Sequence, residues 1–159
     1  MGAERHDARR PPYAEDEPMC TPEYHPSPRF MADEVLERAV LATPSSVGLL
    51  RDLAEAHLNK WGLASVVDDA TLVISELLTN AVKAKPRHLM GFRLMKWRAV
   101  LYIEVFDESS EDAVPAAATG DLLENGRGLH IVAALSRHWG QRREPGGGKT
   151  VYALLDLPG

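Results

Sequence analysis

Glu76 and Asn80 are the residues whose types and spacing most readily suggest chemistry. They lie four positions apart in the segment LVISELLTNAVKAK, which otherwise consists mostly of good helix formers. Residues four apart on a helix share one face, with about 5–6 Å between their Cβ atoms. An Asn carbonyl oxygen is a ligand suited to Mg²⁺, and a carboxylate one turn away can accept a proton from water or a hydroxyl group. From spacing alone, the polar surface of an amphipathic helix is the simpler explanation.

Two further motifs could contribute to a binding site. Asp107 ends the alternating segment VLYIEVFD, where its carboxylate could accept a hydrogen bond from a purine amino group or simply favour a turn. In GRGLHIV, Gly126 and Gly128 let backbone N–H groups approach an anion at the positive end of a helix, and Arg127 adds charge. A plain glycine turn before a helix explains the same residues. Each motif is therefore weak by itself.

The segment GGGKT, residues 146–150, suggests at first sight a phosphate-binding P-loop. A P-loop requires a glycine where Arg143 stands and a helix after the Lys-Thr pair. The residues that follow, VYALLDL, have the composition of a strand instead. We therefore reject the P-loop and expect a tight hairpin turn, with Lys149 and Thr150 entering the last strand.

Three helices are predicted from the apolar periodicity. SSVGLLRDLAEAHLNKWG has helical spacing, opens with a serine cap and ends at Gly62. ASVVDDATLVISELLTNAVKAK, which contains Glu76 and Asn80, has Ser65 as its expected N-cap and is ended by Pro86. The third helix follows the glycines of GRGLHIV. The second helix is thus the element that must position the carboxylate and amide.

Five strands are predicted, in the segments EVLERAVLATP, RHLMGFRLMKWR, AVLYIEVFDES, HWGQRRE and KTVYALLDL. A hairpin through Arg98 and Ala99 joins the second and third strands, and residues 108–124 are expected to form a loop. The order of strands and helices predicts an α+β fold. We expect a two-layer α/β sandwich, in which a mixed, mostly antiparallel sheet carries helices on one face.

Composition limits the classes of function and the domain organisation. The net charge of −5 gives no electrostatic case for nucleic-acid binding, and Cys20 is the single cysteine. No apolar stretch reaches about 18 residues and the N-terminus lacks the apolar core of a secretory signal, so we expect no membrane span and a cytoplasmic protein. Residues 1–30 hold six prolines and are expected to form a flexible tail, with docking as the alternative. Residues 31–159 are expected to form one domain.

Together, and in this order, SELLTNAV, VFDES, GRGLHIV and GGKTVYALL resemble the N box and glycine boxes of a known ATP-binding fold. Gyrase, a heat-shock chaperone, histidine kinases and mismatch-repair ATPases share this fold. The chain is too short for those multidomain proteins and resembles the single-domain anti-sigma-factor serine kinases, from about residue 35 to 158. This implies a regulator that phosphorylates a serine on an anti-anti-sigma (STAS-type) partner and sequesters a sigma factor, as a possible homodimer. The alternative is a partner-switching module without kinase activity, with or without bound nucleotide.

The resemblance implies roles at the phosphate end of the site. Asn80 would hold the Mg²⁺ ion that bridges the ATP phosphates. Glu76 would be the base for the attacking hydroxyl group or water. Gly126 and Gly128 would close the pocket and contact phosphate, with Arg127 between them. In phosphoryl transfer most of the catalysis is positioning and charge neutralisation, so this small set of groups is sufficient.

The resemblance also implies roles at the adenine end, and this chain departs from the pattern there. Asp107 would accept a hydrogen bond from the adenine amino group, and Thr150 would lie near the adenine. Family members often have glycine where this chain has Ser109, so we expect a less tight turn beneath the adenine. After the N box, KAK stands where a histidine is frequent, and it either supplies positive charge or ends the helix. The segment after Asp107 is unfavourably acidic for a triphosphate, with Glu108, Glu111, Asp112, Asp121 and Glu124.

Overall fold

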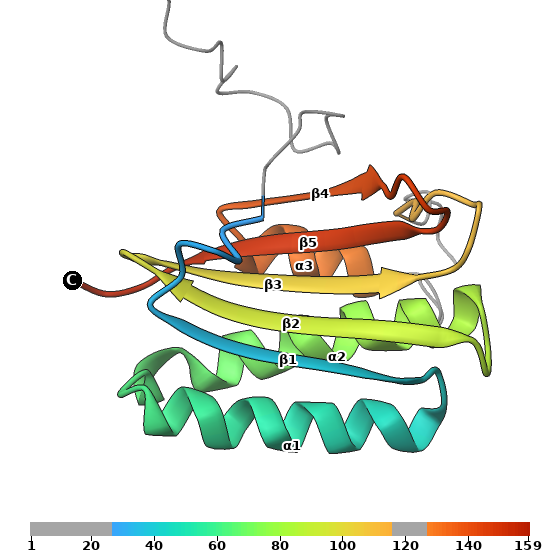
Figure 1. Ribbon diagram of the computed structural model, residues 1–159. Coiled ribbons are helices and arrows are strands. Elements are labelled where there is room, and N and C mark those ends of the chain that lie inside the picture. The colour runs from blue at the N-terminus through green and yellow to red at the C-terminus, as the bar shows by residue number, and fades with distance from the viewer. Residues whose placement is uncertain (1–26, 116–126) are drawn as a thin grey trace, which may run out of the picture.

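The computed structural model describes residues 27–115 and 127–159 (Figure 1). Most of the proline-rich segment, including Cys20, lies outside the described residues, as does Gly126. The described elements are β1 (Glu34–Leu41), α1 (Pro44–Lys60), a 3₁₀ turn (Ala64–Val66), α2 (Val67–Ala84), β2 (Leu89–Trp97), β3 (Val100–Asp107), α3 (Gly128–Leu135), β4 (His138–Arg143) and β5 (Lys149–Asp156). The predicted order of helices and strands is confirmed.

The five strands form one sheet in the order β1-β2-β3-β5-β4, and each neighbouring pair is antiparallel. The helices cover one face of this sheet, as Figure 1 shows. The predicted α+β sandwich is therefore confirmed. Both predicted hairpins are present: Arg98 takes a φ of 54° in the first, and Gly147 and Gly148 take positive φ in the second. Glycine tolerates that backbone conformation without steric cost, which explains the glycine run before β5.

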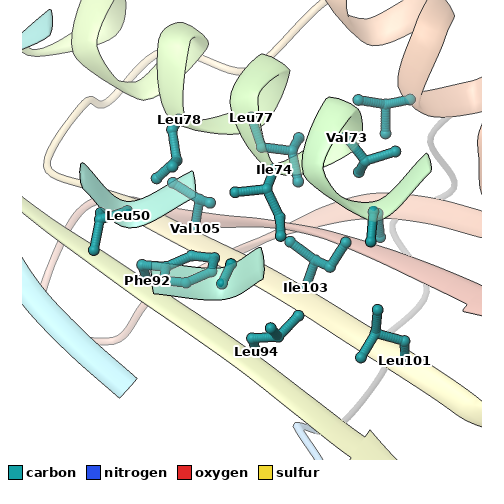
Figure 2. Close-up of a cluster of buried hydrophobic side chains, with 14 of the residues drawn as sticks. Leu50, Val73, Ile74, Leu77, Leu78, Phe92, Leu94, Leu101, Ile103 and Val105 are labelled. Atoms are coloured by element: carbon teal, nitrogen blue, oxygen red, sulfur yellow. The ribbon is translucent and has the colours of Figure 1, made fainter. Parts of the chain in front are cut away.

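The core lies between α2 and the sheet. Figure 2 shows four apolar side chains of α2 pointing toward β2 and β3, where alternate residues form the other wall. The ten side chains labelled there are Leu50, Val73, Ile74, Leu77, Leu78, Phe92, Leu94, Leu101, Ile103 and Val105. Because side chains alternate along a strand, Asp107 lies on the same face as Val105, at the end of β3. The packing that holds α2 on the sheet thus also brings Asp107 to the helix side.

The ends of the helices differ from the prediction at two points. The N-cap of α1 is Thr43, whose hydroxyl accepts a hydrogen bond from Ser46 N–H at 3.3 Å, and Pro44 takes the first helical position, where its missing N–H costs nothing. Ser65 does not cap α2, because it lies inside the preceding 3₁₀ turn. Two aspartates in the first turn of α2, next to the positive end of the helix dipole, stabilise that end instead.

The described part of the chain has no helix that combines the length and the apolar character needed to cross a bilayer.

Candidate functional site

A cavity of about 280 Å³ lies between the C-terminal half of α2, the adjoining ends of β3 and β5, and the start of α3. Asn80, Asp107 and Gly128, three of the residues proposed from sequence, line it. They come from three elements that are far apart in the chain. The structure therefore brings the N box, the first-box aspartate and the second glycine box together around one hollow.

Glu76 and Asn80 face the start of α3. A Cβ atom added to Gly128 would lie 2.7 Å from Glu76 Oε2 and 3.5 Å from both the oxygen and the nitrogen of the Asn80 amide. Both side chains are half-buried. They are therefore not the open polar surface of an amphipathic helix, which was the simpler explanation of their spacing. Asn80 lines the cavity, whereas Glu76, one helical turn away, is not among the lining residues.

Asp107, which also lines the cavity, is part of a buried ion pair. Its Oδ1 atom is 2.9 Å from Nζ of Lys149, and each of these side chains is 3% exposed. The two residues face each other in the β3–β5 register, which fixes the pairing through the backbone. The ammonium group of Lys149 is therefore a second buried charge, next to the Asp107 carboxylate that is expected to bind adenine. Lys149 was not predicted as a site residue from the sequence.

Ser109 does not loosen the turn after Asp107. Its N–H donates a 2.9 Å hydrogen bond to Asp107 Oδ1, and its hydroxyl accepts one from Glu111 N–H at 3.1 Å. Ser109 is buried and is not among the residues with positive φ, so the position does not require glycine. The expectation of a less tight turn is wrong, because serine supplies a local hydrogen bond that glycine lacks.

Two side chains of β4 hold the cavity wall formed by residues 109–113. Arg143 donates to the carbonyl oxygens of Ser109, at 3.2 Å, and Ser110, at 2.7 Å, and it also pairs with Asp112. Gln141 accepts a hydrogen bond from Ala113 N–H at 2.9 Å and donates one to the Ala113 carbonyl oxygen at 3.3 Å. The wall is therefore anchored by an adjacent strand. Part of its acidic charge is neutralised by the arginine.

Thr150 is not placed in this cavity. Lys149 and Thr150 are consecutive in β5, so their side chains point to opposite faces of the sheet. The hydroxyl of Thr150 donates a 2.6 Å hydrogen bond to Glu144. Thr150 lines a separate hollow, which Phe106 also lines. The residue next to Asp107 is Lys149. In the structure, Lys149 shares its face of β5 with the core residues Val151 and Ala153.

In both the second glycine box and the KAK segment, one described residue lines the cavity and another does not. Gly128 begins α3 and lines the cavity, whereas Arg127 precedes the helix as an exposed residue outside the lining. Gly126 lies outside the described residues. Of the two lysines after the N box, Lys83 lines the cavity and Lys85 forms the C-cap of α2. Both alternatives raised by the sequence, added charge and helix termination, are thus realised by different residues.

The donor set at the Asn80 end fits a lightly held Mg²⁺ ion. The described residues contain no group of three or more acidic, histidine or cysteine side chains that could hold a metal by themselves. Mg²⁺ commonly binds through one or two protein oxygens together with phosphate oxygens and waters. The Asn80 carbonyl oxygen beside the space over Gly128 meets that requirement.

A comparison with protein families agrees with this geometry. The profile of the histidine kinase-like ATPase domain matches residues 40–154, which is well over half of the chain. The chain belongs to this family, which makes it an ATP-binding regulatory protein. No curated protein matches the chain closely enough to narrow the assignment.

Proposed function

We propose that the protein is an ATP-dependent serine kinase that phosphorylates an anti-anti-sigma protein of the STAS type and, in its free state, sequesters a sigma factor. The observation that carries the proposal is the juxtaposition of Glu76 and Asn80 with Gly128, beside a cavity that Asn80, Gly128 and Asp107 line together. The resemblance to single-domain anti-sigma-factor kinases supports the choice of partners. It also supports a homodimer as the working assembly.

The nucleotide would lie in the cavity between Asp107 and Gly128. The adenine amino group would donate to Asp107, and the phosphates would approach the N-terminal end of α3 at Gly128, where backbone N–H groups and the helix dipole favour an anion. Asn80 would help to hold Mg²⁺, which neutralises charge on the phosphates when bound. Lys83, in the cavity wall, adds a positive charge near the end of α2.

The proposed reaction is an in-line transfer of one phosphoryl group. The oxygen of the partner's serine hydroxyl attacks the γ-phosphorus, and a new P–O bond forms. The bond between the γ-phosphorus and the β,γ-bridging oxygen breaks, so ADP leaves with that electron pair. The hydroxyl proton passes to the Glu76 carboxylate. The chain's part is thus to position the phosphates and accept one proton, as is usual for phosphoryl transfer.

The second candidate is a partner-switching protein that does not transfer phosphate. The acidic wall favours it, because Glu111 and Asp112 line the cavity, and Glu111 is exposed. Such charges oppose a triphosphate unless they are neutralised. Arg143 pairs with Asp112, which reduces that objection and leaves the kinase as the better-supported function.

The test is a transfer assay with matched variants. Purified protein is incubated with Mg²⁺, γ-labelled ATP and candidate STAS-domain proteins, and label on the partner's serine is measured. Glu76→Gln should abolish transfer, whereas Glu55→Gln, an exposed glutamate on α1, should leave it unchanged. Binding of ATP without transfer to any partner would favour the switching protein. Absence of binding at millimolar ATP would contradict the kinase and would favour a switching protein that acts without bound nucleotide.

A further inference from the structure

Lys149 is a buried cation in the wall of the ATP cavity, and its position is built into the fold. The preceding residue, Gly148, has a φ of 80°, and a Cβ there would collide with the Asp107 carbonyl oxygen and lie 2.7 Å from the Phe106 ring. The missing side chain allows the ends of β3 and β5 to approach closely. Lys149 therefore enters β5 directly opposite Asp107.

The hydrogen bonds of Asp107 leave one of its carboxylate oxygens for a ligand. Among the described residues, the bonds from Ser109 N–H and from Lys149 Nζ both end on Oδ1. Oδ2 is then the atom that can accept from a bound molecule. An ammonium group has three N–H donors, and one of them is directed at Asp107. The cavity thus presents an acceptor and a donor side by side.

A buried ion pair needs a reason beyond stability. Removing two charges from water is costly, and replacing such a pair by apolar residues is often neutral or stabilising. Here both residues of the pair line a cavity rather than filling a core. A ligand that supplies a donor next to an acceptor would complete the hydrogen bonding of both.

The edge of adenine has this pattern. Its exocyclic amino group is a donor, and the ring nitrogens beside it are acceptors, whereas guanine carries a carbonyl oxygen in place of the amino group. We propose that Lys149 is a specificity-determining residue of the ATP site. Its ammonium group donates a hydrogen bond to the ring nitrogen next to the exocyclic amino group of adenine, and that amino group donates a hydrogen bond to Asp107. This inference rests on the proposed role of Asp107 in binding ATP.

The experiment compares ATP with analogues that lack a single acceptor. Calorimetric titrations measure the binding of ATP, 1-deaza-ATP and 7-deaza-ATP to the wild-type protein and to Lys149→Met. On the wild type, one of the two analogues should bind about tenfold more weakly than ATP, as expected for a lost charge-assisted hydrogen bond. Lys149→Met should bind ATP about tenfold more weakly and should no longer distinguish ATP from that analogue. Lys96→Met, in β2 and outside the cavity wall, is the matched control and should behave as the wild type.

The outcomes separate this inference from the proposed function. Equal binding of ATP and both analogues by the wild type would overturn the role of Lys149, and this arm needs no variant to fold. Retained discrimination in Lys149→Met would also overturn it and would leave Lys149 as a structural partner of Asp107. Failure of the wild type to bind ATP would contradict the nucleotide-binding function itself, and with it the role of Lys149. If Lys149→Met does not fold, the comparison of ATP with the two analogues on the wild-type protein still decides the question.

Discussion

The carboxylate of Glu76 lies against the Cα atom of Gly128, so closely that a Cβ on Gly128 would come within 2.7 Å of Oε2. Gly128 is not among the glycines with positive φ. The position therefore requires the absence of a side chain rather than an unusual backbone conformation. The start of α3 and the N-box helix meet at this contact.

Gly128→Ala should impair chemistry more than folding. The added methyl group meets the end of a flexible side chain, so the Glu76 carboxylate can move aside without disturbing the core. A displacement of about 1 Å at a catalytic group can cost up to about 100-fold in turnover. We expect such a loss in ATP turnover or phosphoryl transfer, with a melting temperature close to that of the wild type. Gly146→Ala is the control, because no atom lies within 4 Å of its added Cβ; equal turnover in the two variants would contradict the prediction.

Asn80→Ala and Glu76→Ala should fail in different ways. Loss of the Asn80 oxygen should remove the dependence of ATP binding on Mg²⁺, because that atom is the proposed metal ligand. Loss of Glu76 should leave binding intact and lower turnover by about 10²–10⁴-fold, the usual contribution of a general base. ATP titrations with and without Mg²⁺, paired with single-turnover assays, measure both effects. Asn59→Ala, on the exposed side of α1, is the control for Asn80→Ala. Equal loss of binding in the Asn80 and Glu76 variants would contradict the assigned roles.

Arg143→Ala should loosen the cavity wall. The variant loses two hydrogen bonds to backbone carbonyl oxygens and the pairing with Asp112. We expect faster amide hydrogen exchange in residues 109–113 and ATP affinity lower by about fivefold, which corresponds to about 1 kcal/mol. Arg137→Ala removes an exposed ion pair with Asp156, away from the cavity, and should change neither measurement. Unchanged exchange in Arg143→Ala would show that the wall does not depend on this side chain.

Gly48→Ala should stabilise the protein. Gly48 lies inside α1, and no atom comes within 4 Å of an added Cβ. Alanine in a helix interior is favoured over glycine by about 0.5–1 kcal/mol. The free energy of unfolding, measured by urea denaturation, should rise by about this amount. Gly62→Ala should lower it instead, because Gly62 has a φ of 76°, which alanine adopts only with strain.

The sequence by itself determined the elements and their order. Helical and alternating periodicities located α2 and β3, proline and glycine marked the ends of helices, and the fold class followed. These signals are local, because each depends on residues a few positions apart. The ends of two helices differ from the prediction: the cap of α1 is Thr43, and Ser65 falls inside a 3₁₀ turn.

The sequence also named Glu76, Asn80, Asp107 and Gly128 through the order of their motifs. It could not show that the Glu76 carboxylate touches Gly128, because the distance between residues on different elements depends on how α2 and α3 pack. The same holds for Ser109, whose departure from glycine suggested a loose turn until the hydrogen bond from Glu111 N–H to its hydroxyl was seen.

Only the tertiary structure decided which residue of β5 stands beside Asp107. The sequence resemblance pointed to Thr150, but the β3–β5 register places Lys149 opposite Asp107 and turns Thr150 to the other face of the sheet. A register is fixed by backbone hydrogen bonds and by the turn that precedes the strand. A shift of one residue exchanges the two faces, so a motif defined only by residue spacing cannot specify which side chain enters the site.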